Sequence, residues 1–168
     1  MKKLLLTLSI LALSSAAFAA ESFTVDPKHT FPGFEVNHMG LSTQRGRFNA
    51  SSGKITLDRA GKTGTVDIEI DAGTVNTGLP ALEKHLRSED FFNVEKYPKI
   101  TFKSNRMDFE EGAPKSIHGE LTLLGITKPV TLQVSSFNCR VHPINKIYAV
   151  PAVSDDVRLF IQIEAFRD

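Results

Sequence analysis

The 168-residue sequence contains one cysteine, Cys139, and no tryptophan. A lone cysteine excludes an internal disulfide, so packing must stabilise the fold. Several enzyme signatures are missing as well. There is no G-x-S-x-G nucleophile motif, no G-x-G-x-x-G or Walker phosphate loop, and no H-x-x-x-H or C-x-x-C metal pair. We therefore expect a protein that is not an enzyme and that has no catalytic residue, metal or cofactor of its own.

Long hydrophobic runs are also scarce, and the one that is present lies at the start of the chain. Lys2-Lys3 precedes an apolar stretch of ten residues, Leu4 to Leu13, and Ala17-Phe18-Ala19 follows as a small-residue cleavage motif. Ten apolar residues are too few to cross a bilayer, and this order of parts is typical of a secretory signal peptide. The sequence predicts a signal peptide over residues 1–19, periplasmic localisation, and a single domain over residues 20–168.

Neither sign of charge is in excess. Without Lys2 and Lys3, 18 basic residues remain against 19 acidic ones, a formal charge of −1. A surface that binds nucleic acid needs a basic patch, so the balance argues against nucleic acid as a partner.

The sequence is rich in period-two alternation of apolar and polar residues. The pattern is clearest over residues 65–71, where Val66, Ile68 and Ile70 alternate with three acidic residues. It also predicts strands over residues 34–38, 44–58, 99–107, 116–124, 129–137 and 156–166, the second of them bent near Ser51-Ser52-Gly53. Consecutive strands with one apolar face favour an all-β fold, an up-and-down antiparallel β-barrel of about eight strands.

A short helical insertion interrupts the strands at about residues 79–94. Leu79, Leu82 and Leu86 recur at helical spacing, and Pro80 suits a first turn, so a helix is predicted over residues 80–87.

Two adjacent phenylalanines follow this helix. Ser88 is predicted to cap a second helical turn that carries Phe91 and Phe92. Such a pair forms either a lid over an apolar interior or one closed end of the core.

The apolar strand faces and the Phe pair are the candidate lining of a ligand-binding interior. A barrel of this size has an interior that side chains fill or that holds one small ligand. The candidate lining residues are Phe34, Val36, Phe48, Val66, Ile68, Ile70, Phe91, Phe92, Ile100, Phe102, Leu121, Leu123, Val130, Leu132, Val134, Leu159 and Ile161.

Four basic side chains are candidates for the rim of that interior: Arg45, Arg47, His85 and Arg87. Arg45 and Arg47 flank Gly46 on one strand, so they point in the same direction. The alternatives are a basic rim that contacts a polar or anionic head-group and a solvated surface beside acidic strands.

Several motifs resemble the YceI-like family of bacterial lipid- and polyisoprenoid-binding proteins, and the similarity covers nearly all of residues 22–166. The segments that carry it are Thr24-Val25-Asp26-Pro27-Lys28-His29, Arg45-Gly46-Arg47-Phe48, His85-Leu86-Arg87-Ser88-Glu89-Asp90-Phe91-Phe92, Lys96-Tyr97-Pro98-Lys99-Ile100-Thr101-Phe102-Lys103-Ser104, Gly119-Glu120-Leu121-Thr122, Gly125-Ile126-Thr127-Lys128-Pro129-Val130 and residues 150–157. The resemblance implies a lipocalin-like, eight-stranded antiparallel barrel. It also implies an apolar interior that takes a long isoprenoid chain such as a quinone tail, and no catalytic residues.

In one place the sequence departs from the family pattern. Between residues 146 and 148, relatives carry a further segment with a second cysteine and the seventh strand, and its absence implies that Cys139 is unpaired. Either residues 147–150 form a short replacement strand, or the loop crosses the barrel and leaves an open seam. An open seam exposes strand edges that need a cover, such as the second copy of a homodimer.

Together these features predict a periplasmic carrier or storage protein for a polyisoprenoid lipid, such as an isoprenoid quinone, with transient membrane contact. Two alternatives come from other classes. One is a stress-linked interaction protein whose open seam binds a partner strand. The other is a metal- or haem-associated redox protein that uses His38, His85, His118 or His142.

Overall fold

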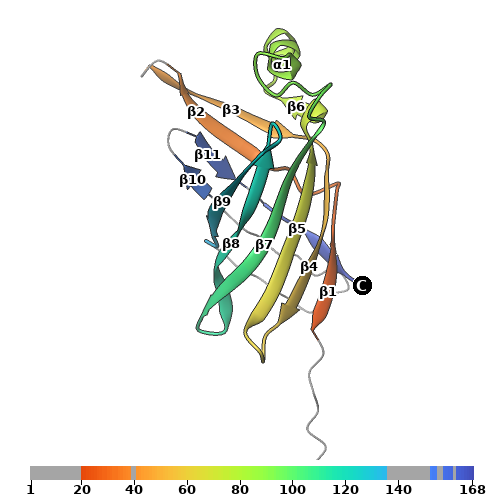
Figure 1. The fold of residues 1–168 in the computed structure, drawn as a ribbon, viewed down its shortest axis with the longest axis vertical. Helices are drawn as coiled ribbons and strands as arrows, with labels where there is room; N and C mark the ends of the chain where they lie inside the picture. The colour runs from red at the N-terminus through yellow and green to blue at the C-terminus, as the bar shows by residue number, and fades with distance from the viewer. Residues whose placement is uncertain (1–19, 39–40, 136–151, 155–156, 161) are drawn as a thin grey trace, which may run out of the picture.

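Two antiparallel sheets make up most of the computed structural model, which describes residues 20–38, 41–135, 152–154, 157–160 and 162–168 (Figure 1). The seven-stranded sheet has the order β12-β1-β4-β5-β7-β8-β9, and the five-stranded sheet has the order β10-β11-β2-β3-β6. The strands are β1 (Glu21–Val25), β2 (Gly33–His38), β3 (Ser42–Phe48), β4 (Ser51–Asp58), β5 (Thr63–Asp71), β6 (Val75–Asn76), β7 (Lys99–Glu110), β8 (Ala113–Leu123), β9 (Ile126–Gln133), β10 (Ala152–Ser154), β11 (Val157–Phe160) and β12 (Ala165–Arg167).

Four stretches of chain contribute to both sheets. β1 and β2, β3 and β4, β5 and β6, and β11 and β12 are consecutive pairs in which one strand belongs to each sheet. In each pair the chain leaves one sheet and enters the other. Joined in this way, neighbours in the sheets are neighbours in the chain, which is the up-and-down order. The all-β, barrel-type fold expected from the sequence is confirmed.

Among the described residues, the edge strands β9 and β10 are not paired with each other by backbone hydrogen bonds. β9 ends one sheet and β10 ends the other, and β10 has only three residues and lies against β9. The barrel is thus not closed there by the described strands. Residues 147–150, Cys139 and His142 lie outside the described residues, so the predictions made for them stay predictions.

Backbone hydrogen bonds stabilise the positions where the chain passes from one sheet to the other. The amide of Asp26 donates to the carbonyl of Glu164 over 2.6 Å, and the amide of Asp71 donates to the carbonyl of Ala50 over 3.0 Å. The predicted single strand 44–58 is therefore wrong in one respect. It is two strands, β3 and β4, and the break falls at residues 49–50 rather than within Ser51-Ser52-Gly53, which begins β4.

The predicted strand 156–166 is also divided. Ile163, Glu164 and Ala165 are all buried in succession, which breaks the period-two pattern where the chain passes from β11 to β12. The bend places Glu164 at the corner between the sheets, where its backbone exchanges hydrogen bonds with the Thr30 hydroxyl.

The first strand was missed by the sequence analysis. β1 pairs with both β4 and β12, and Phe23 is fully buried with Val25 beside it. The alternation of Phe23 and Val25 with Ser22 and Thr24 was a usable signal, but it is only five residues long.

The predicted helix 80–87 is confirmed as α1 (Pro80–Arg87). The amides of Thr77 and Gly78, just before it, donate to Oε1 of Glu83. Ser88 is the C-cap of α1 and not the N-cap of a second helix, because its amide and hydroxyl both donate to the carbonyl of His85. Among the described residues, no helix is long and apolar enough to span a membrane.

Candidate functional site

Three aromatic rings pack together where the helical connection meets the interior. Phe34 of β2 and Phe48 of β3 have ring centroids 5.8 Å apart, and Phe92 lies 6.1 Å from Phe34 and 5.4 Å from Phe48. Tilted and edge-to-face pairs of this kind each contribute about 0.5–1.5 kcal/mol beyond simple burial. Phe92 thus fixes the connection after α1 onto the inner face of the five-stranded sheet.

Phe91 does not join this cluster. It is 44% exposed and packs edge-on against His85, with ring centroids 4.8 Å apart. The expectation that Phe91 lines the interior is therefore wrong. The two rings diverge because residues 88–92 form turns instead of a helix, with the amide of Phe92 donating to the carbonyl of Leu86.

The other candidate lining residues fall into two groups, and the more buried group lies mainly on the seven-stranded sheet. These core residues are Phe48, Val66, Ile68, Ile70, Ile100, Phe102 and Leu132. The second group is half-buried, and all of it except Val36 packs against the core; it comprises Phe34, Val36, Phe92, Leu121, Leu123, Val130 and Val134. Ile161 and the side chain of Leu159 lie outside the described residues.

The seven-stranded sheet is tightly packed on its inner face. A Cβ atom at Gly119 of β8 would come within 2.6 Å of the Phe102 ring, so the ring occupies the space above the glycine. Further along β8, the side chains of Leu121 and Leu123 are only half-buried. The side chains of Val130 and Val134, after the β8–β9 turn, are half-buried as well. The inward side chains that keep surface to bury are therefore on β8 and β9 rather than on β4 and β5.

The four basic candidates do not converge on the interior. Arg45 and Arg47 lie on the face of β3 opposite Phe48; Arg45 pairs with Glu35 over 2.6 Å, and Arg47 lies 4.7 Å from the centroid of the Phe31 ring. Arg87 donates to the carbonyl of Val75, and His85 lies 3.4 Å from Asp90. None of these contacts requires a ligand.

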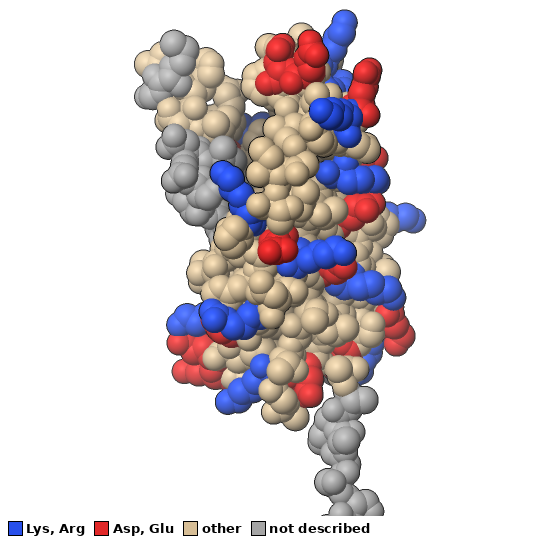
Figure 2. All heavy atoms as spheres, in the orientation of Figure 1, with Lys and Arg blue, Asp and Glu red and all other residues tan. Residues whose placement is uncertain are grey.

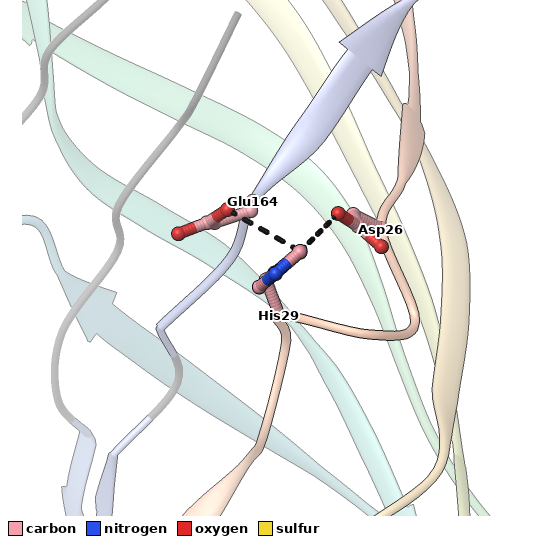
Figure 3. A group of neighbouring side chains, drawn as sticks. All are labelled: Asp26, His29 and Glu164. Carbon is pink, nitrogen blue, oxygen red and sulfur yellow. Dashed lines mark hydrogen bonds and ion pairs between the residues drawn. The ribbon is translucent and has the colours of Figure 1, made fainter. Parts of the chain in front are cut away.

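A polar cluster occupies the corner between the sheets, and the sequence analysis missed it (Figure 3). Asp26 follows β1, His29 lies in the turn before β2, and Glu164 precedes β12. Nδ1 of His29 is 2.5 Å from Oδ2 of Asp26 and 3.8 Å from Oε2 of Glu164. Both carboxylates are buried, whereas the imidazole is exposed.

Opposing effects set the ionisation of Asp26. Burial raises the pKa of its carboxyl group, but hydrogen bonds from His29 and from the amide of Lys28 outweigh burial, and the pKa lies below its ordinary value. The carboxylate is therefore charged in the folded protein at neutral pH, and it holds the turn between β1 and β2.

The donor set of this cluster is one that divalent metals use. Asp26, His29 and Glu164 each offer a ligand atom, and these atoms lie within 4.8 Å of one another. Ligand bonds of about 2.0–2.2 Å in a tetrahedral site place neighbouring ligand atoms about 3.3–3.5 Å apart. The 2.5 Å contact between Asp26 and His29 is shorter than that and is a hydrogen bond. An ion could bind only after this bond opened.

The histidines of the redox alternative are dispersed. His38 ends β2, His85 lies in α1, and His118 lies on β8, and among the described residues they form no group of three or more convergent metal ligands. Nε2 of His118 is 2.7 Å from Oδ2 of Asp108, and this hydrogen bond is the main reason that the pKa of Asp108 is lowered.

The outer face of the seven-stranded sheet carries interspersed charges of both signs (Figure 2). Lys99 pairs with Glu69 over 3.1 Å, and Lys103 approaches Asp67 to 3.9 Å. Exposed pairs of this kind contribute little to stability, about 0–1 kcal/mol each.

Comparison with known proteins identifies relatives of this arrangement. The model of the YceI-like domain family matches residues 23–165. A UPF0312 protein of Pectobacterium carotovorum is 39% identical over 137 residues, which cover 79% of this chain and 71% of the relative. Protein YceI of Salmonella arizonae is 38% identical over 138 residues, which cover 79% and 72%.

Solved structures share the fold. BcnA of Burkholderia cenocepacia has a TM-score of 0.63 at 19% identity, and the match covers 84% of this chain and 98% of BcnA. A polyisoprenoid-binding domain of Saccharophagus degradans, implicated in plant cell wall breakdown, has a TM-score of 0.56 at 15% identity, with 87% and 98% covered.

Proposed function

This chain belongs to the YceI-like domain family, and from that premise we propose that it is a carrier or storage protein for a polyisoprenoid lipid, such as an isoprenoid quinone. It acts by binding and not by catalysis. The lipid tail occupies the barrel interior on the side bounded by β2, β8 and β9.

One observation carries this proposal. The inner faces of β2, β8 and β9 present apolar side chains that are only half-buried, although they face the interior: Phe34, Leu121, Leu123, Val130 and Val134. Half-buried apolar side chains that face inward have surface left to bury against a ligand. On β4 and β5 the inward side chains are already fully packed, so that side of the barrel acts as the wall.

Non-polar contacts suffice for such binding. At about 0.8 kcal/mol per buried CH₂ group, one five-carbon unit contributes roughly 3–4 kcal/mol before ordering costs. A few units therefore give useful affinity without a polar constellation. Binding without polar contacts agrees with the arrangement of Arg45, Arg47 and Arg87, whose side chains contact other residues of the protein.

The proposed compartment is the periplasm, and the signal peptide predicted over residues 1–19 supports it. The solved Saccharophagus degradans domain, which is described as polyisoprenoid-binding and shares the fold, supports the ligand class.

A direct test is titration of lipid-free protein with a long-chain isoprenoid quinone, followed by native mass spectrometry. The proposal predicts a saturable complex of one lipid per chain, weakened by Leu121→Ser or Val130→Ser on the interior side. The matched control is Thr122→Ser, an outward-facing position between two interior ones. Binding that does not saturate, or that all three variants share with the native protein, contradicts the proposal.

A further inference from the structure

The two ends of the barrel differ in the chemistry of their turns. Because consecutive strands are antiparallel, the connections β2–β3, β6–β7 and β8–β9 lie at one end, and β4–β5 and β7–β8 lie at the other (Figure 1). We call the first the α1 end; its described residues are Leu41, residues 77–98 and residues 124–126.

Large apolar side chains project from all three connections of the α1 end. Leu41 is 85% exposed, Leu79 56% and Ile126 60%, and Phe91 joins them. Among the residues that the structure describes, the turns of the opposite end are Arg59-Ala60-Gly61-Lys62 and Glu111-Gly112, and these two turns contain no large apolar side chain. Among the described residues, four of the five exposed large apolar side chains therefore lie at the α1 end, and the fifth, Phe166, lies on β12. A concentration of exposed apolar side chains at one end marks a contact surface.

The α1 end is continuous with the proposed binding interior. Phe91 is exposed, yet its neighbour Phe92 packs on Phe34 and Phe48 inside the barrel. Tyr97 of the β6–β7 connection reaches Gly125 of the β8–β9 turn, where a Cβ atom would come within 2.8 Å of its ring. The exposed rim and the inner aromatic cluster therefore share one segment of chain.

Charge at this end points to the nature of the partner. The segment from residue 80 to residue 96 contains Glu83, Glu89, Asp90 and Glu95 against Lys84, Arg87 and Lys96, so neither sign dominates. A mixed, near-neutral rim does not match a strongly charged protein surface. Separate apolar side chains on three turns are instead suited to a fluid bilayer, which accommodates each of them independently.

We propose that the α1 end docks on a lipid bilayer, with Leu41, Leu79, Phe91 and Ile126 inserted among the lipids. The inference rests on the proposed function, because a carrier must meet the membrane that supplies its lipid. Docking in this orientation turns the inner aromatic cluster of Phe34, Phe48 and Phe92 toward the bilayer. Partial burial of a few side chains gives weak and reversible attachment, as transfer requires.

The test is co-sedimentation with vesicles of phosphatidylethanolamine and phosphatidylglycerol, and with vesicles of phosphatidylcholine alone. The variant Leu41→Ser, Leu79→Ser, Ile126→Ser removes three rim side chains, none of which packs in the interior. Phe166→Ser is the matched control, since Phe166 is 38% exposed but lies on β12, away from the α1 end. Circular dichroism and retained lipid show that each variant is folded and loaded.

We expect the triple variant to bind both kinds of vesicle about tenfold more weakly than the native protein, the control to bind as the native protein does, and added salt to have little effect. Equal binding by the triple variant and the native protein would overturn the docking proposal. So would a native protein that retains lipid but binds neither vesicle. A native protein that binds vesicles but retains no lipid contradicts the proposed function instead.

Discussion

The ring of Phe34 on β2 lies over Gly46 on β3, so that a Cβ atom at Gly46 would stand 2.4 Å from Cζ of the ring. The missing side chain at Gly46 leaves room for the ring, which packs against Phe48 and Phe92. Ring and glycine therefore form part of the inner face of the five-stranded sheet.

Gly46→Ala should displace the Phe34 ring and weaken the aromatic cluster. We expect a loss of about 1–2 kcal/mol in the free energy of unfolding, because overpacking moves a side chain and not the backbone. Lipid retention should fall as well. Urea denaturation and native mass spectrometry measure the two effects.

Gly53→Ala provides the comparison. Its Cβ atom would meet the backbone carbonyl oxygen of Asp67 at 2.2 Å, so the β4–β5 ladder itself must shift. We expect a larger destabilisation than at Gly46 in the same denaturation experiment. If Gly46→Ala proves the more destabilising of the two, the Phe34 ring is held more rigidly than its half-buried position indicates.

Phe92→Ala and Phe91→Ala should differ sharply. Phe92 contacts two rings of the interior, so its removal should cost about 3 kcal/mol and reduce lipid retention. Phe91 is substantially exposed, so Phe91→Ala should lower the free energy of unfolding by less than about 1 kcal/mol. Thermal unfolding of the two variants, compared with the native protein, measures the difference. Equal costs would show that the two rings act as one unit, contrary to the geometry.

Acid should destabilise the corner between the sheets through Asp26. The pKa of this carboxyl group is lower in the folded protein than its ordinary value of 3.8. The folded state therefore holds the proton less tightly than the unfolded state does. Its contribution to stability is complete above the unfolded pKa and is lost as the pH falls through the lower, folded pKa.

Asp26→Asn should remove that part of the acid dependence. Asp67→Asn is the control, because Asp67 is an exposed carboxylate near Lys103. Unfolding free energies of the three proteins are measured from neutral pH to below pH 4. If the unfolding free energies of Asp26→Asn and of the native protein change in parallel over the acid range, Asp26 does not contribute to the acid dependence of stability.

Local patterns in the sequence were sufficient to predict α1 and the central strands. Pro80 and the spacing of Leu79, Leu82 and Leu86 placed the helix at its observed bounds. The alternation of residues 65–71 lies within β5. These elements depend on neighbours in the chain, which a single sequence contains.

Features that depend on distant parts of the chain were missed. The bend at Asn49–Ala50 is held by residues 71 and 74, and Glu164 meets Asp26 and His29 from the other end of the chain. The adjacent residues Phe91 and Phe92 were both expected to line the interior. A turn ending at Asn93, whose φ is +43°, sends them in different directions. Neither the pairing of remote residues nor that backbone conformation is visible in residue spacing.

The central claim is that the barrel interior holds a polyisoprenoid lipid, and its most direct test is mass spectrometry of lipid extracted from protein purified from its own cells without detergent. The account predicts a polyisoprenoid in a ratio of about one per chain, reduced in the Phe92→Ala protein and retained in the Phe166→Ser protein. Native protein that is folded and free of any polyisoprenoid after this gentle preparation would contradict it.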